Sequence, residues 1–191
     1  LIEWLEGHRL EVLELFKRLV CRGNIEVLGS GFYEPILAMI PEADQVGQIK
    51  KMNDWALQRM DYEIKGNWLT ERVWEPHLAQ SLNKADIDYM VVDDYHFLTT
   101  GADPENLNGY YYTEQEGKVL SVFPISQKMR YAMPFEDPQV AIDILKSYAT
   151  DDGDSLVVMA DDGEKFGIWP GTWETVYGQK WLERFLTLVS E

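Results

Sequence analysis

Short apolar runs alternate along this chain with longer segments whose apolar residues recur at helical spacing. The apolar runs, each of which predicts a strand, occupy residues 25–28, 67–69, 89–92, 119–123 and 155–160. The segments between and around them predict helices over residues 12–20, 41–56, 76–85, 138–145 and 173–189. This alternation is typical of an α/β fold in which parallel strands are joined by helical crossovers.

Composition excludes several classes of protein. With 46% hydrophobic residues in 191, the chain is long and apolar enough to bury a core. Its net charge of −16 disfavours binding to nucleic acid or to an anionic membrane surface. No apolar stretch approaches the roughly 20 residues needed to span a bilayer. A single cysteine, Cys21, rules out an internal disulfide, and we expect it to be a buried structural thiol in a cytoplasmic protein.

The chain starts at Leu1 in the middle of a helical pattern, without an initiator methionine or a signal peptide. We therefore expect residues 1–191 to be one segment of a longer protein, truncated at both ends. No repeat or linker divides it.

Acidic side chains follow three of the predicted strands at their carboxyl ends. Glu71 follows residues 67–69, whereas two acidic pairs, residues 93–94 and 161–162, follow the later strands. Because the carboxyl ends of parallel strands share one face of a sheet or barrel, we expect these acids to converge. The alternative is that they cap the helices that follow.

Converging carboxylates serve either glycosidic bond cleavage or the binding of a hard metal ion. Flat aromatic side chains near the acids favour a sugar, and Trp68 and Trp169 are placed for this role. We expect Trp173 and Trp181 to belong to the core instead. His77 is expected at the surface, and His96 either reaches the site or makes a structural hydrogen bond.

A metal-dependent hydrolase or phosphatase using Asp93, Asp94, Asp161 and Asp162 remains an alternative. The three histidines lack the spacing of a zinc-binding helix, and the chain has neither a phosphate-binding loop nor a Gly-x-Ser-x-Gly elbow. We therefore predict no metal and no cofactor.

Five segments together resemble glycoside hydrolase family 57, in its 4-α-glucanotransferase and α-amylase type. They are residues 23–27 (GNIEV), 31–35 (GFYEP), 68–76 (WLTERVWEP), 91–97 (VVDDYHF) and 161–170 (DDGEKFGIWP). The resemblance implies an incomplete, TIM-like (β/α)7 barrel that here lacks its first strand. It also implies a retaining enzyme that cleaves α-1,4-glucosidic bonds in an α-glucan or maltooligosaccharide.

The resemblance also implies roles for individual residues. The family nucleophile falls on Glu71 and the acid/base falls on Asp162, rather than on Asp161. Sugar-contacting acids fall on Glu26 and Glu164. The family's histidine motif would lie before Leu1, and a later motif would lie beyond residue 191.

In the implied mechanism, Glu71 attacks the anomeric carbon while Asp162 protonates the leaving oxygen. We expect the neighbouring acids Asp161 and Glu164 to favour the protonated form of Asp162 by like-charge repulsion. Retention requires the two catalytic carboxyl groups to lie about 5–5.5 Å apart. A predicted loop over residues 98–117, rich in tyrosine, is a candidate acceptor subsite.

Three alternatives stay open. The chain could be a non-catalytic glucan-binding relative, the metal-dependent hydrolase described above, or a structural fragment whose exposed strand edges lead it to pair with other copies as a homo-oligomer.

Overall fold

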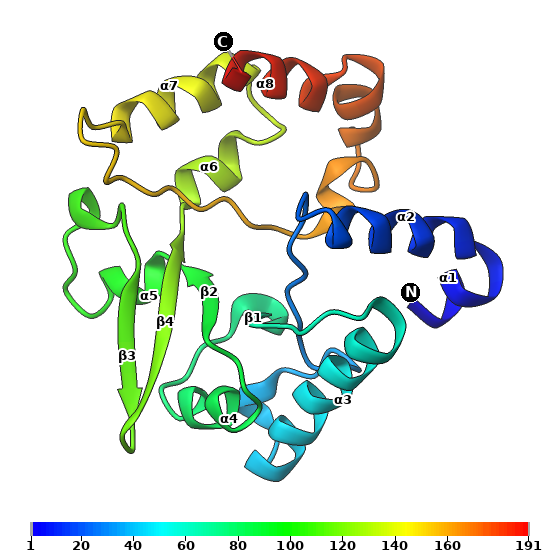
Figure 1. Cartoon of the computed structure of the whole chain (residues 1–191). Coiled ribbons are helices and arrows are strands. Elements are labelled where there is room, and N and C mark those ends of the chain that lie inside the picture. Colours follow the sequence, from blue (N-terminus) through cyan, green and yellow to red (C-terminus); the bar gives the residue numbers. More distant parts are fainter. Residues whose placement is uncertain (1, 191) are drawn as a thin grey trace. The chain divides into compact units, whose positions relative to one another are not determined.

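The computed structural model describes residues 2–190 (Figure 1). The helices are α1 (Ile2–His8), α2 (Leu10–Cys21), α3 (Glu42–Met60), α4 (Leu78–Lys84), α5 (Tyr95–Leu98), α6 (Gln127–Ala132), α7 (Pro138–Tyr148) and α8 (Trp181–Ser190). The strands are β1 (Gly66–Trp68), β2 (Tyr89–Asp93), β3 (Tyr111–Gln115) and β4 (Lys118–Ile125). Short 3₁₀ turns lie at Leu37–Met39, Thr70–Arg72, Pro104–Asn106 and Gly163–Phe166, and a π-helical turn lies at Glu174–Gly178.

The strands form one sheet in the order β1-β2-β4-β3 (Figure 1). By its internal contacts the chain divides into two compact units, and β2, β3 and β4 contribute residues to both. Unit 1 comprises Leu1–Met90 and Thr113–Leu120, and unit 2 comprises Val91–Tyr112 and Ser121–Glu191. Because it combines these helices with one sheet, the molecule is an α/β protein, as predicted.

A β-hairpin makes the sheet mixed, which corrects the expectation of parallel strands throughout. Strands β3 and β4 are joined by Glu116 and Gly117, whose φ angles of 50° and 74° suit a tight hairpin turn. The predicted loop over residues 98–117 is accordingly wrong for its last part, which forms β3. The Glu-Gly pair between two runs of strand-forming residues was the signal for this hairpin.

Unit 1 packs α3 and α4 against each other, with apolar side chains buried between them. Helix α3 begins after Pro41 with acidic residues in its first turn, and it ends at Asp61 in the left-handed conformation. Its buried face, which includes Ile49 and Ala56, shares the core of the unit with Leu78 and Leu82 from α4. Next to β1, Gly29 forms a parallel bridge to Asn67, so the predicted strand at residues 25–28 pairs only at the residue that follows it.

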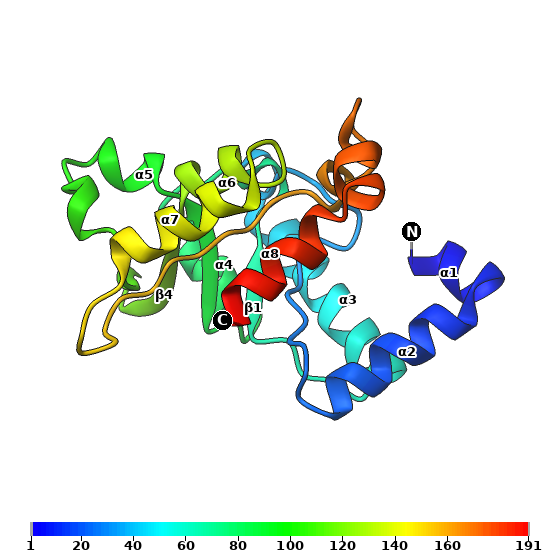
Figure 2. The same ribbon diagram turned by 90° about the horizontal axis from the view of Figure 1, so that it is seen from above.

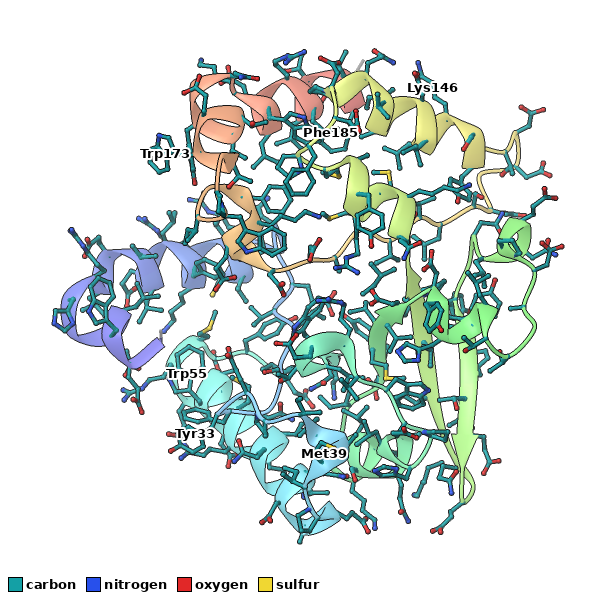
Figure 3. All side chains as sticks on the ribbon, turned by 180° about the vertical axis from the view of Figure 1, so that it is seen from behind. Tyr33, Met39, Trp55, Lys146, Trp173 and Phe185 are labelled. Atoms are coloured by element: carbon teal, nitrogen blue, oxygen red, sulfur yellow. The ribbon has the colours of Figure 1, made fainter. Side chains whose placement is uncertain are left out.

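Unit 2 is built around Trp181, which is 2% exposed and donates its indole N–H to the Glu136 carbonyl at 2.6 Å. Helix α7 is capped by Asp137, with Pro138 in its first turn, and it packs on α8 (Figure 2). Phe185 stacks on Trp181 and points into this cluster, whereas Trp173 points outward (Figure 3). The prediction for Trp181 is thus confirmed, and that for Trp173, which is 65% exposed, is wrong.

Three further expectations are corrected. The predicted strand at residues 155–160 makes only an isolated parallel bridge, between Val158 and Ile125. The predicted helix over residues 173–189 is interrupted, because Lys180 adopts a left-handed φ of 55° between the π-helical turn and α8. Cys21 is exposed rather than buried. Within residues 2–190, none of the helices combines the length and apolar character that crossing a membrane requires.

Candidate active site

In unit 2, one arginine binds the acid at the end of β2 and an acid from a segment much later in the chain. Arg130 lies in α6, the helix that follows β4, and its Nη1 donates to Asp93 Oδ1 at the end of β2 at 3.0 Å. Its Nε and Nη2 donate to the two carboxylate oxygens of Asp161 at 3.2 and 3.3 Å. Asp93 and Asp161, one residue from each of the two acidic pairs, therefore converge on the same guanidinium within this unit.

Asp161 is the centre of this cluster. Its side chain is fully buried and accepts hydrogen bonds from Arg130, from Lys165 Nζ at 2.5 Å, and from the backbone N–H of Asp162 at 3.0 Å. Burial by itself raises the pKa of Asp161, but the hydrogen bonds from Lys165, Arg130 and the Asp162 amide outweigh it and hold the pKa below its ordinary value. Asp161 therefore stays ionised at neutral pH and is unsuited to hold a catalytic proton.

The two cations of the cluster are themselves well satisfied. The Lys165 side chain is 3% exposed, donates to the Arg130 carbonyl oxygen, and lies over the Phe135 ring at 5.2 Å. Burial of Arg130 acts to lower its pKa, but the hydrogen bond to Asp161 and the charges of Asp93 and Asp161 raise it overall. The cluster thus holds two positive and two negative charges in direct contact.

The acids do not act as conventional helix caps, which was the alternative to a site. Asp94 and Asp162 occupy N-cap positions, but neither side chain caps its own helix. Asp94 Oδ2 instead accepts the backbone N–H of Gln127 at 3.0 Å, which ties the end of β2 to the start of α6.

This arrangement does not suit a metal ion. Asp93 and Asp161 both face the Arg130 guanidinium, and Asp161 also faces Lys165. Within residues 2–190, no group of three or more His, Cys, Asp or Glu side chains is arranged to hold a cation. The cations needed for charge balance are supplied by the protein itself, so the geometry disfavours the metal-dependent alternative.

The segment after Asp161 is a tight turn that carries two other predicted site residues. The Glu164 carbonyl accepts the backbone N–H groups of Ile168 and Trp169 at 2.8 and 3.0 Å. Glu164 and Trp169 are both exposed, as contact with a substrate requires. Gly167 has a φ of 136°, and an added Cβ would lie 2.5 Å from the Tyr177 ring, so this turn depends on glycine.

In unit 1, Glu71 lies in an unusual backbone turn directly after β1. Glu71 and Arg72 both have φ values of 55°, which residues other than glycine seldom adopt. The Glu71 side chain is exposed, and the Arg72 guanidinium lies 5.8 Å from the centre of the Trp68 ring. Such backbone strain clusters at functional sites, and here it turns the chain sharply at the predicted nucleophile.

Glu26 lies at the other end of the unit 1 strands. It accepts a hydrogen bond from the hydroxyl of Tyr89, the first residue of β2, whereas Glu71 follows the last residue of β1. Burial and this bond to Glu26 raise the pKa of Tyr89, so its hydroxyl remains a donor. The structure therefore does not bring Glu26 and Glu71 together within unit 1.

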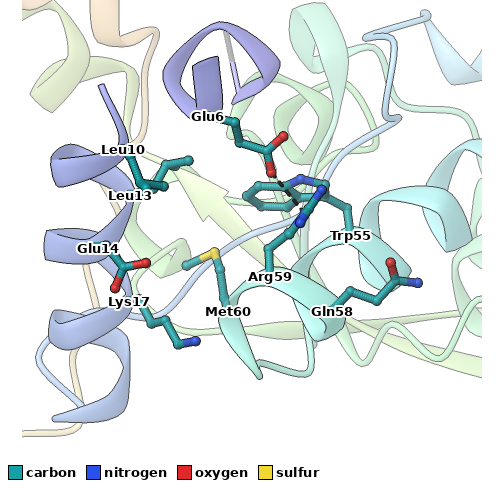
Figure 4. A pocket seen from close by; sticks show the side chains of 9 residues that line it. All are labelled: Glu6, Leu10, Leu13, Glu14, Lys17, Trp55, Gln58, Arg59 and Met60. Atoms are coloured by element: carbon teal, nitrogen blue, oxygen red, sulfur yellow. Dashed lines mark ion pairs between the residues drawn. The ribbon is translucent and has the colours of Figure 1, made fainter. Parts of the chain in front are cut away.

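Unit 1 also contains a cavity of about 350 Å³ between α1, α2 and α3 (Figure 4). Trp55, Met60 and Leu13 form its apolar walls, and an ion pair of 3.0 Å between Arg59 and Glu6 lies at one side. None of the predicted site residues lines it.

Two residues of the cluster were missed by the sequence analysis. Lys165 had a local signal, because it follows Asp161 by four residues and carries the opposite charge. Arg130 had none, since its partners lie 31 and 37 residues away and only the fold brings them together.

Comparison with known proteins identifies the family. Residues 1–190 match the model of Glycosyl hydrolase family 57. The chain belongs to this family. A 4-alpha-glucanotransferase from Thermococcus litoralis is 47% identical over the whole chain, and an alpha-amylase from Pyrococcus horikoshii is 48% identical over the same range. This family 57 chain spans 29% and 30% of the length of those two relatives.

Two solved structures of family 57 enzymes have the same fold as this chain. The crystal structure of the Thermococcus litoralis 4-alpha-glucanotransferase superimposes with a TM-score of 0.95 at 46% identity, covering all of this chain and 30% of that one. A family 57 branching enzyme from Pyrococcus horikoshii, at 18% identity and a TM-score of 0.73, covers 97% of this chain and 46% of its own and shares the fold.

Proposed function

We propose that this chain forms part of the catalytic domain of a retaining enzyme that acts on α-glucans, as a 4-α-glucanotransferase or an α-amylase. The observation that carries the proposal is family membership over residues 1–190, with relatives at 47% and 48% identity that are named for these two activities. We further propose that its sheet belongs to an incomplete (β/α)7 barrel. Parallel pairing of Gly29 with Asn67 and of Ile125 with Val158 supports this architecture.

In the proposed mechanism, Glu71 is the nucleophile and Asp162 is the acid/base. The carboxylate of Glu71 attacks the anomeric carbon, and Asp162 gives its proton to the departing sugar oxygen. Asp162 then takes a proton from water or from a sugar hydroxyl, which attacks the glycosyl ester and releases Glu71. Water as the acceptor gives hydrolysis, and a second glucan gives transfer.

The buried ion cluster supports the choice of Asp162 over its neighbour. An acid catalyst must hold a proton at working pH, and Asp161 is held ionised by Lys165 and Arg130. Glu164, Trp68 and Trp169 remain proposed sugar contacts. Glu26 does not, because it lies at the opposite end of the unit 1 strands from Glu71.

Kinetics of the full-length protein on maltoheptaose test these roles. We expect Asp162→Asn to lower kcat by on the order of 10²–10⁴-fold, because the leaving alkoxide then departs unprotonated. Glu71→Gln should abolish turnover, since no covalent intermediate can form. Asp143→Asn, on the exposed face of α7, is the control and should retain wild-type activity. Wild-type rates in both site variants would remove Glu71 and Asp162 from the mechanism, whereas a wild-type protein that binds maltoheptaose without converting it would be a glucan-binding relative.

A further inference from the structure

We propose that Arg130 is a positioning residue for the acid/base Asp162, and that it acts through Asp161 and Lys165. The inference rests on the proposed function, because it assumes that Asp162 exchanges a proton with the substrate. Arg130 itself need not touch the sugar.

Asp162 is anchored on both sides by its neighbours in the chain. The preceding residue, Asp161, is fixed by the Arg130 side chain through two hydrogen bonds and accepts the Asp162 amide N–H at 3.0 Å. Three residues later, Lys165 donates to the Arg130 carbonyl oxygen and to Asp161. Residues 161–165, which include Asp162, are therefore held at both ends by contacts to Arg130.

Arg130 also connects this segment to the sheet. Arg130 Nη1 also binds Asp93 at the last position of β2. Ser126, the N-cap of the arginine's own helix, donates its backbone N–H to Val158 O at 2.8 Å, three residues before Asp161. Displacement of the segment that carries Asp162 would therefore have to break partly buried, charge-assisted contacts, which fixes the position of the acid/base within unit 2.

Among the residues with a positive charge, only arginine fits this position. The three donor nitrogens of the guanidinium are all used, in two directions. Lysine would keep the charge, but its single nitrogen cannot hold both oxygens of Asp161 and reach Asp93 as well. Arg130→Lys therefore separates geometry from charge.

The experiment compares two reactions of the full-length protein. Cleavage of maltoheptaose needs a proton on the leaving sugar oxygen. With α-maltosyl fluoride as donor and azide as acceptor, Glu71 displaces fluoride, which leaves without a proton, and azide then displaces Glu71 without a base. The second reaction needs the nucleophile and sugar binding, but it does not need Asp162.

We expect Arg130→Lys to lose on the order of 10²-fold in kcat/KM on maltoheptaose, as a misplaced catalytic group does, and only a few-fold on fluoride with azide. Arg184→Met, which breaks an exposed ion pair to Asp137, is the matched control and should leave both rates unchanged. Equal losses of Arg130→Lys in the two reactions, or no loss in either, would overturn the positioning role.

Two further variants make the result decisive. Asp162→Asn should itself lose maltoheptaose cleavage and keep the fluoride-azide reaction, and its failure to do so would refute the acid/base assignment instead. If Arg130→Lys does not fold, Asp93→Asn removes one of the three arginine contacts and leaves the other two. The same selective loss, at a smaller fold-change, is expected from it, and equal losses in both reactions would overturn the proposal.

Discussion

At the scale of single residues, the ion pairs that a carboxylate makes in the fold, rather than its neighbours in the sequence, decide whether it is suited to hold a proton. Asp161 and Asp162 are adjacent, and a carboxylate neighbour is expected to repel charge from the acid/base. Asp161 is instead neutralised by Arg130 and Lys165. The sequence predicted both acids, but it contained no local sign of Arg130, whose partners are brought together only by the fold.

Replacing Asp161 tests how much this cluster contributes to the free energy of unfolding. Asp161→Asn leaves the buried Lys165 and the largely buried Arg130 without their main partner, so we expect a loss of about 3–5 kcal/mol in the free energy of unfolding at neutral pH. Because the pKa of Asp161 is lowered in the folded protein, its charge stabilises the fold above the unfolded-state pKa of about 3.9. That contribution is lost as the pH falls through the folded-state pKa.

Denaturant unfolding from pH 7 down to pH 3 measures this effect. The difference between wild type and Asp161→Asn should stay constant from pH 7 to about pH 5 and shrink below about pH 4. Asp143→Asn, which changes an exposed carboxylate, should differ little from wild type at any pH. A difference that persists undiminished at pH 3 would show that the charge of Asp161 is not what stabilises the cluster.

At the scale of elements, periodicity predicted the helices well and the strands less well. The helices α2, α3, α4 and α7 lie within a few residues of their predicted ranges, because an amphipathic stripe needs only one packed face. Strand pairing depends on partners far along the chain, so residues 155–160 read as a strand yet pair only at Val158. The hairpin β3–β4 and the break at Lys180 depend on left-handed residues, which an apolar pattern does not reveal.

The turn that carries Glu164 and Trp169 gives a prediction at this scale. Gly167→Ala should destabilise the protein by about 1–3 kcal/mol, because alanine is strained at a φ of 136° and its Cβ would meet Tyr177. Gly163→Ala is the matched control in the same turn, since a Cβ there would meet nothing within 4 Å. Denaturant midpoints should fall for the first variant and stay near wild type for the second. Equal midpoints for the two would contradict the role assigned to Gly167.

At the scale of the whole molecule, the α/β class and the family followed from a few segments. The alternation of helices and strands predicted the class, and the motifs around Glu71 and Asp162 predicted the family. The mixed sheet was missed, since crossover patterns favour parallel strands and the hairpin breaks that rule locally. The assignment of Glu71 as the nucleophile and Asp162 as the acid/base is the central claim of the mechanism.

Trapping the covalent intermediate tests that claim most directly. The full-length Asp162→Asn variant is mixed with α-maltosyl fluoride and digested, and its peptides are analysed by mass spectrometry. The fluoride leaves without a proton, and without a base the ester hydrolyses slowly, so we predict a maltosyl adduct on Glu71 that is absent from Glu71→Gln. An adduct on another residue, or release of inverted maltose without any adduct, would contradict the account.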